Sequence, residues 1–441
     1  MKKLFIFFGW LAILISLSSV TSLASIDNLS NMSAEWIRTG NRNAATDAAD
    51  ITVYNPAGVT CLKDGLHINF SNQTLIRQPS HSFNLNLPGG GGNESLEQDG
   101  IDWLLPNLYG VYKKKNWAIF GGIYIPGGGA VANYTDGSIN TKFIGSLTVL
   151  SSNGALQSFR NDWLEASSYY IASTIGGAYA FNDSISVAVG LRHITAKNEI
   201  SSGMIFTDAA GGDHHYKLET EETANGFGGT LGFNLKPHEK INIGLRYETR
   251  IELDFETEVN RNDFPQEFQL AVDNAKNRRD FPASFGLGVA YDVNPKLELE
   301  YDYTYYFQDD ADWGKNSAGE DLSDLAGETW SMGVTAAYQH TPKLLLSVGA
   351  IYTYFNWNNI DNYYQTLGAF EVLYWNNWNF GTGFAYQINP KIKFNFGISW
   401  TIWEDKTIDF KRGENMGLGR ATVNSENSSG TIAFGIDVAF E

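Results

Sequence analysis

Four basic residues stand on the polar side of segments in which apolar and polar residues alternate: Arg192, Arg246, Arg250 and Lys393. Side chains on the same face of neighbouring strands can converge, and a cluster of such cations could bind a carboxylate. The same polar faces carry the acids Glu248, Glu298 and Glu300, and we favour pairing of the cations with these acids. The cations alone therefore do not decide whether the chain binds an anion.

The histidines give little support for catalysis. His214 and His215 are adjacent, with Asp213 beside them. Neighbouring side chains on an extended chain point to opposite faces, so the two imidazoles would not converge on one metal ion or one reacting atom. The acidic segment 309–314 lacks the glycine and acid spacing of a calcium loop. We therefore expect no catalytic residue, no metal ion and no cofactor.

The elements that would position these groups are β-strands. Within residues 430–440, five large apolar residues alternate with small or charged ones: Ile432, Phe434, Ile436, Val438 and Phe440. Large apolar groups on one face and small or polar groups on the other are typical of a barrel strand between lipid and an aqueous lumen. The pattern recurs in 185–192, 241–248, 297–305 and 392–402. A water-soluble sandwich could also alternate, but so many Trp and Tyr residues would overfill its core.

Short turns and long polar connections follow one another along the chain, which is the asymmetry of bacterial barrels with short periplasmic turns. Strands are predicted to start near Leu66, Ile101, Asn116, Glu165, Ser184, Tyr216, Lys240, Phe281, Lys296, Glu328, Lys343, Tyr374, Lys391 and Ser429. The long connections include 126–164 and 198–215. We predict an all-β fold, an antiparallel transmembrane β-barrel of about 14 strands over residues 66–441.

Residues 1–24 have the three parts of a secretory signal peptide: the basic start Met1–Lys3, an apolar run over 4–17, and the small-residue site Ser22–Ala24. The chain is therefore expected to be exported. Its formal charge is −18, which argues against a nucleic-acid partner. Aromatic residues make up 14% of a chain with a mean hydropathy of −0.24, as expected for a barrel with a lipid-facing aromatic surface and a polar lumen.

Residues 25–65 precede the first expected strand and lack its alternation. A barrel of this size encloses more space than its lumen side chains fill, so this segment could plug it. Segment 41–58 resembles the hatch of the FadL-type outer-membrane transporters of long-chain fatty acids and aromatic hydrocarbons. The resemblance rests on a Gly and Arg, then an acidic patch, then Asn-Pro-Ala before the first strand: Gly40, Arg42, Asp47, Asp50, Asn55, Pro56 and Ala57. The hatch is less Gly-rich here than is usual in the family.

A Pro-Gly-Gly-Gly sequence interrupts the third expected strand: Pro126, Gly127, Gly128 and Gly129. Proline cannot donate to the ladder, and glycine frees the backbone to bend. The resemblance implies that a kink in this strand provides a lateral exit from the lumen into lipid. The alternative is that Pro126 ends the strand and begins the outer loop.

The resemblance implies passive outer-membrane transport of hydrophobic molecules, either long-chain fatty acids or aromatic hydrocarbons. The solute would be captured among the outer loops, pass the hatch and leave through the wall near the third strand. Phe143, Ile144 and Leu147 in the connection 126–164 could form the capture groove, or could pack the loop on itself. A fatty-acid carboxylate would need lumen cations such as Arg192, whereas a hydrocarbon would need none.

We expect a monomer surrounded by outer-membrane lipid in a Gram-negative-type bacterium, because one barrel holds the entire route. Two other functions fit a barrel. A porin-like channel for small polar solutes would need an open lumen, against which the hatch argues. A structural or adhesive barrel would be expected to have outer loops that are polar throughout.

Overall fold

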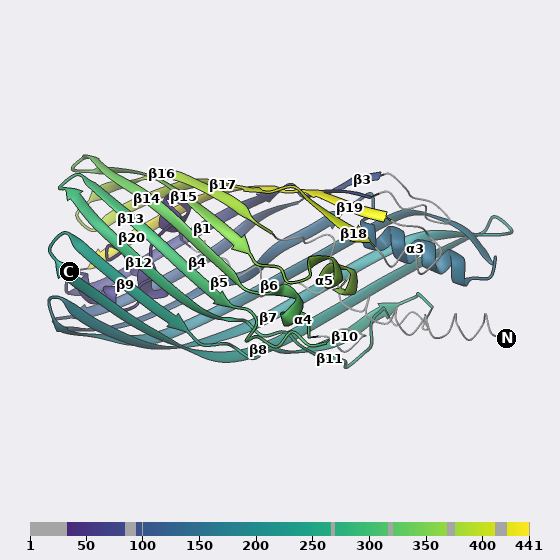
Figure 1. Ribbon diagram of the computed structural model, residues 1–441, viewed down its shortest axis with the longest axis horizontal. Helices are drawn as coiled ribbons and strands as arrows, with labels where there is room; N and C mark the ends of the chain where they lie inside the picture. The colour runs from purple at the N-terminus through teal and green to yellow at the C-terminus, as the bar shows by residue number, and fades with distance from the viewer. Residues whose placement is uncertain are drawn as a thin grey trace.

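The computed structural model describes residues 33–83, 94–98, 100–265, 270–315, 321–367, 375–410 and 421–440. The predicted signal peptide 1–24 and the first residues of segment 25–65 lie outside these ranges. The molecule is an elongated barrel with short turns at one end and longer excursions at the other (Figure 1). None of the helices in the described ranges combines the length and the apolar character needed to cross a membrane.

Fourteen antiparallel strands close the barrel, because β8 pairs with β9 and β1 pairs with β20. The strands are β1 (Gly65–Arg77), β4 (Ile101–Lys114), β5 (Trp117–Tyr134), β6 (Leu156–Asn182), β7 (Ile185–Asp208), β8 (Asp213–His238), β9 (Ile241–Glu248), β12 (Ala283–Asn294), β13 (Leu297–Phe307), β14 (Thr329–Thr341), β15 (Leu344–Phe355), β16 (Asn377–Asn389), β17 (Ile392–Trp403) and β20 (Ser428–Phe440). The predicted fold class is confirmed.

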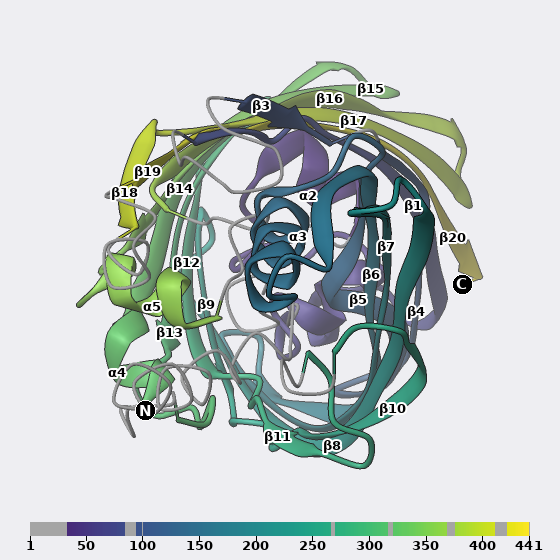
Figure 2. The same ribbon diagram turned by 90° about the vertical axis from the view of Figure 1, so that its right-hand side faces the viewer.

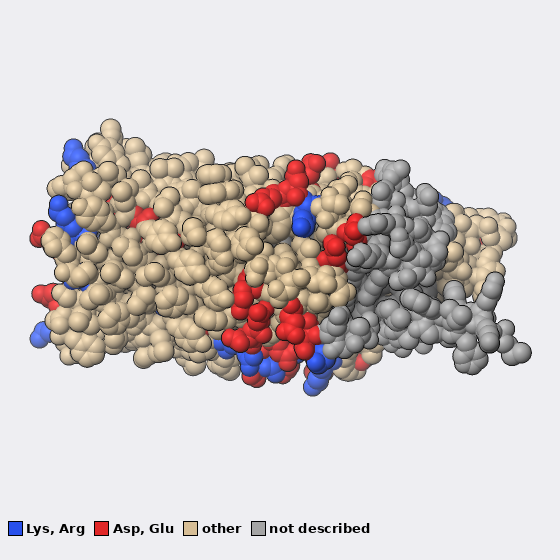
Figure 3. All heavy atoms as spheres, in the orientation of Figure 1, with Lys and Arg blue, Asp and Glu red and all other residues tan. Residues whose placement is uncertain are grey.

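The two faces of each strand differ as the alternation predicts. In β20, Phe434 and Ile436 are 51% and 43% exposed on the outside, whereas the side chain of Asp437 faces inward and is 15% exposed. Figure 3 shows a broad belt with few charged side chains, bounded by basic and acidic residues at the turn end and by a concentration of acidic residues toward the other end. This belt is the surface that hydrocarbon chains of a bilayer would cover.

Three strands are much longer than the prediction. β6, β7 and β8 have 27, 24 and 26 residues. Strand β6 begins at Leu156 instead of near Glu165, and most of the expected connection 198–215 is strand. The shorter β10 (Asp254–Asn262) continues the sheet on the outer half of β8, and β11 (Lys276–Arg278) pairs with β10.

Among the described residues, the outer end also carries a small sheet and three helices. The sheet has the order β18 (Lys406–Phe410), β19 (Ala421–Glu426), β2 (Ser80–Phe83) and β3 (Glu94–Glu97). The helices are α3 (Ile139–Ser151), α4 (Leu322–Ala326) and α5 (Ile360–Leu367). A capping box starts α3, because the Ser138 hydroxyl accepts from the Thr141 N–H while the Thr141 hydroxyl accepts from the Ser138 N–H. Helix α3 therefore lies within the expected loop 126–164.

The N-terminal segment lies inside the barrel, where it forms α2 (Ala34–Thr39) and the 3-10 turns η2 (Ala49–Val53) and η3 (Gly58–Cys61) (Figure 2). Ser33 caps α2 by accepting from the N–H of Trp36 at 3.0 Å. Gly40 ends the helix with a φ of 74°, a conformation that favours glycine. We call residues 33–64 the hatch.

Candidate functional site

An ion network lies at the centre of the hatch. The guanidinium of Arg42 lies 2.7 Å from carboxylate oxygens of both Asp47 and Asp50. The Ser33 hydroxyl donates to Asp50 at 2.7 Å. Desolvation acts to raise the pKa of Asp47, but Arg42 and then Lys393 hold that pKa well below its usual range. The structure thus brings together the Arg and the acids that the sequence singled out.

Acids of the barrel wall hold the hatch backbone. The N–H groups of Arg42 and Asn43 donate to Asp302 of β13 at 2.7 and 2.8 Å, and the N–H of Ala44 donates to Glu300 at 2.7 Å. Glu300, a predicted partner for lumen cations, thus holds the hatch instead.

The Asn-Pro-Ala sequence contacts β7 and β8. The amide of Asn55 donates to Asn234 of β8 at 2.7 Å, and its carbonyl accepts from the N–H of Gly58 at 3.2 Å. The carbonyl of Ala57 accepts from the hydroxyl of Ser186 at 2.9 Å. Pro56 lies against Gly232, where an added Cβ would come within 2.7 Å of the proline ring. These contacts join the end of the hatch to the wall.

Glycines let the hatch approach the wall closely. A Cβ added at any of several lumen-facing glycines would collide with hatch atoms: Gly232, Gly244, Gly288, Gly333, Gly349 and Gly381. These residues lie on β8, β9, β12, β14, β15 and β16. The hatch therefore seats against successive strands around the barrel, at a distance that a larger side chain would not permit.

The cations predicted to face the lumen have internal partners. Arg192 lies 3.1 Å from Glu248, the pairing that the sequence favoured, and Lys393 lies 3.1 Å from Asp437. The guanidinium of Arg246 donates to the backbone carbonyl of Val53 in η2. Two of the three cations are thus neutralised by wall acids, and the third binds the hatch.

Arg250 lies beyond the strand whose alternation predicted its direction. It follows the end of β9 at Glu248, where the alternation that placed it inward no longer applies. Its side chain is 40% exposed and lies 3.3 Å from Asp280.

Arg279 is a buried cation that the sequence reasoning missed. Its guanidinium lies 2.5 Å from Glu222 of β8 and 4.3 Å from the ring centroid of Phe255. It follows β11, outside the alternating segments of the sequence, so no alternation marks it as inward-facing.

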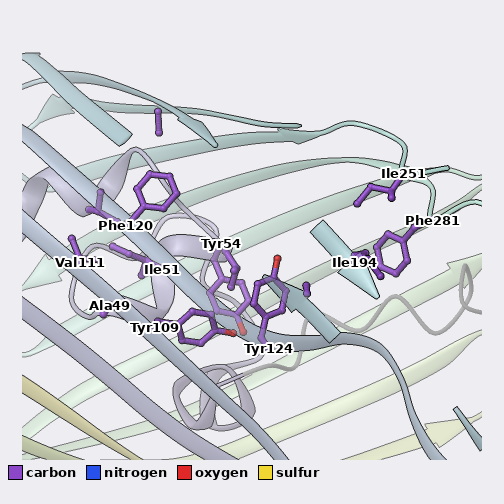
Figure 4. Close-up of a cluster of buried hydrophobic side chains, with 14 of the residues drawn as sticks. Ala49, Ile51, Tyr54, Tyr109, Val111, Phe120, Tyr124, Ile194, Ile251 and Phe281 are labelled. Carbon is purple, nitrogen blue, oxygen red and sulfur yellow. The ribbon is translucent and has the colours of Figure 1, made fainter. Parts of the chain in front are cut away.

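Apolar side chains of the hatch and wall form an inner cluster that includes Ile51, Tyr109, Tyr124, Tyr170, Phe255 and Phe281. Figure 4 labels four of them, Ile51, Tyr109, Tyr124 and Phe281. Tyr109 and Tyr124 have ring centroids 5.8 Å apart, and those of Tyr170 and Phe255 are 6.1 Å apart. The hatch contributes Ile51 and Tyr54, so movement of the hatch would change the packing of this cluster.

A second apolar group, the outer cluster, includes Phe143, Leu147, Phe206, Trp313, Phe355 and Trp375. Phe143 and Leu147 of α3 are each 7% exposed, and Ile144 packs against the same cluster. The ring centroids of Phe159 and Phe206 are 6.3 Å apart beneath α3. The three apolar residues singled out in the sequence are therefore brought together in this cluster at the outer end of the barrel.

The ladder between β4 and β5 breaks off at the outer half of the wall. Its last pair is Leu108 and Ile123, although β5 continues to Tyr134. Strand β5 stays paired with β6 there, with register shifts between Tyr124 and Gly127 and between Gly128 and Ala130. Pro126 thus lies within β5, and Gly128 has a φ of 67°. We call this feature the β4–β5 break.

Side chains rejoin the two strands beyond the break. The N–H of Val131 donates to Asp102 at 3.1 Å, and the amide of Gln98 donates to the carbonyl of Val131 at 2.7 Å. The break therefore lies between the end of the ladder, at Leu108 and Ile123, and these two hydrogen bonds.

A family model described as outer membrane protein transport protein (OMPP1/FadL/TodX) matches residues 30–440. The chain belongs to this family. The FadL/TodX proteins are transport channels for hydrophobic compounds, and the resemblance of the chain to this family is confirmed. The family and the closed barrel together place the chain in the outer membrane.

Solved structures of the FadL/TodX family share the fold at low sequence identity. A FadL homologue from Pseudomonas aeruginosa is 15% identical, with 94% of this chain and 100% of that chain covered and a TM-score of 0.67. The toluene transporter TodX from Pseudomonas putida is 14% identical, with 95% and 100% covered and a TM-score of 0.62. The toluene transporter TbuX from Ralstonia pickettii is 14% identical, with 94% and 100% covered and a TM-score of 0.60. No curated protein sequence matches the chain.

Proposed function

We propose that this FadL/TodX-family protein passes hydrophobic molecules through the outer membrane by lateral exit. The solute enters at the outer cluster, moves to the inner cluster and leaves through the β4–β5 break into the bilayer. The observation that carries this proposal is the position of the break. Tyr109 of β4, Tyr124 of β5 and Tyr170 of β6 belong to the inner cluster and lie on the strands beside it.

The driving force is the transfer of apolar surface. Removing such surface from water is favourable by about 25 cal/mol per Å². The outer cluster, the inner cluster and the lipid offer successive apolar surroundings, so a solute moving down its gradient needs no energy source. The hatch closes the direct route to the periplasm through polar contacts such as those of Arg42 with Asp47 and Asp50.

The pairing of lumen charges favours an uncharged solute. Arg192, Lys393 and Arg279 each lie within 3.1 Å of an acid, so a carboxylate would have to displace a wall acid to bind any of them. The solved relatives TodX and TbuX are toluene transporters, and toluene carries no charge. We place uncharged hydrophobic molecules ahead of fatty-acid anions as substrates.

The other two functions fit the structure less well. A porin for polar solutes would need a continuous aqueous lumen, whereas the hatch contacts strands around the barrel. A structural or adhesive barrel would not need the outer cluster or the β4–β5 break. Because one barrel holds the whole route, we propose that the protein acts as a monomer.

Uptake by cells tests this function. Labelled toluene, labelled oleate and a small labelled sugar are supplied to cells with and without the protein. Faster uptake of toluene, with no gain for the sugar, is expected. Sugar uptake without any gain for toluene or oleate would contradict the proposal and favour a porin.

A further inference from the structure

Two buried asparagines flank the β4–β5 break. Asn107 of β4 immediately precedes Leu108, the last β4 residue with a partner in β5. Its side chain is 3% exposed, and within the described part of the chain neither its amide nitrogen nor its carbonyl oxygen has a hydrogen-bond partner. Leu108 is 46% exposed on the lipid face, so alternation directs Asn107 toward the lumen, the side that holds its neighbour Tyr109.

Asn198 of β7 lies on the other side of the break. It is 2% exposed, and its carbonyl oxygen accepts from the hydroxyl of Ser168 at 2.8 Å, while no described residue accepts from its amide nitrogen. Ser168 in turn touches the kinked part of β5, because a Cβ added at Gly128 would lie 2.6 Å from the Ser168 carbonyl oxygen. Asn198 is thus one side chain away from the glycines of the break.

Buried polar atoms without partners are rare and destabilising in proteins, so their presence calls for an explanation. Here the unpaired groups on the strands beside the break include these amides and the hydroxyl of Tyr109, which carry no charge. The nearby cations are already neutralised, Arg279 by Glu222 and Arg192 by Glu248. The unused hydrogen-bonding capacity beside the break is therefore suited to an uncharged polar group.

We propose that Asn107 binds the hydroxyl group of an otherwise apolar solute as the solute turns from the inner cluster into the β4–β5 break, and that Asn198, farther toward the outer end of the wall, offers a second amide on its path. An amide offers one donor group and one acceptor, and a hydroxyl is its complement in both roles. The ligand class is uncharged molecules with a long apolar part and one hydroxyl, such as long-chain alcohols. This inference rests on the proposed function and names a substrate class for it.

The test compares uptake of labelled dodecane, 1-dodecanol and dodecanoate by cells with and without the protein. The variants are N107L, N198L and the control N72L. Asn72 is paired with Phe434, whose side chain is 51% exposed on the lipid face, so N72L removes an amide from the outside of the wall. Retarded migration of the heated barrel on gels checks that each variant has folded.

The wild type is expected to take up 1-dodecanol faster than dodecane or dodecanoate. Loss of the hydrogen bonds in N107L should lower 1-dodecanol uptake about fivefold and leave dodecane uptake unchanged. N198L should show a smaller loss in the same direction, so the test stands even if one variant does not fold. N72L should behave as the wild type.

Two results would overturn the inference while leaving the proposed function intact. One is dodecane uptake with no preference for 1-dodecanol. The other is a 1-dodecanol preference that persists in both N107L and N198L. A preference for dodecanoate would also overturn it, and would point to Arg279. If none of the three compounds enters faster with the protein present, the proposed function fails together with the inference.

Discussion

Gly349 of β15 lies so close to the carbonyl oxygen of Thr39 in the hatch that an added Cβ would overlap this oxygen. The hydroxyl of Thr335 donates to the same carbonyl at 2.5 Å. The end of α2 is therefore fixed to two neighbouring strands, one through the absence of a side chain and one through a hydrogen bond. The position of the hatch is therefore sensitive to a single methyl group added at Gly349.

Substitution G349A should loosen the hatch. Overpacking of a close contact costs typically about 1–3 kcal/mol, and displacement of the hatch would relieve it. We expect larger and more frequent openings in planar-bilayer conductance recordings than for the wild type. The control is G177A on β6, where the nearest atom to an added Cβ is 3.6 Å away. Equal conductance of G349A and G177A would show that the hatch does not depend on this contact.

Substitution R42Q should release the hatch more strongly. It would leave Asp50, which is fully buried, without its cation, and removal of one partner of a buried ion pair costs about 3–5 kcal/mol. Faster cleavage of the hatch by an added protease, with the barrel intact, is the expected result. The matched control R160Q removes an exposed ion pair with Asp213, which is worth about 0–1 kcal/mol. Protease resistance of R42Q equal to that of R160Q would show that the ion pairs of Arg42 do not hold the hatch in place.

The hatch should loosen as the pH rises. Burial, then the charges of Asp437 and Asp50, raise the pKa of Glu35 well above its ordinary value of 4.5. With the hatch in place, Glu35 therefore keeps a proton that it would lose in water. The contribution of Glu35 to the stability of the hatch in the barrel is full below pH 4.5 and declines as the pH rises through the raised pKa. Asp47 acts in the opposite sense, because its pKa is lowered. Its contribution to holding the hatch in place weakens only as the pH falls below the ordinary value of 3.8.

Conductance recorded from about pH 5 to about pH 8 checks this expectation. Openings of the wild type should become more frequent toward the higher pH. The variant E35Q, which cannot ionise at this position, should show a smaller rise over the same range. A rise in E35Q as steep as that in the wild type would assign the pH dependence to another group.

Much of the barrel could be predicted from the sequence because alternation is local. The apolar face of 430–440 is the outer face of β20, and most strands start within a few residues of their predicted positions. The Arg42, Asp47 and Asp50 network could also be expected, because all three residues lie within a short segment with a family pattern.

The remainder depends on contacts between distant segments. Alternation marks Glu300 as a lumen acid, but nothing local shows that it accepts from the hatch backbone more than 250 residues earlier. Asn107 gave no signal, since its significance depends on where the β4–β5 ladder ends.

Sealing the β4–β5 break tests the central claim most directly. The variant P126V/G127T/G128V/G129T supplies a backbone donor and β-forming residues, so that β5 can continue its ladder with β4. Toluene uptake is compared with that of the wild type in cells with equal amounts of folded barrel. Lateral exit predicts that toluene uptake falls to the level of cells without the protein. Unchanged uptake through the sealed wall would contradict it and direct the route past the hatch to the periplasm.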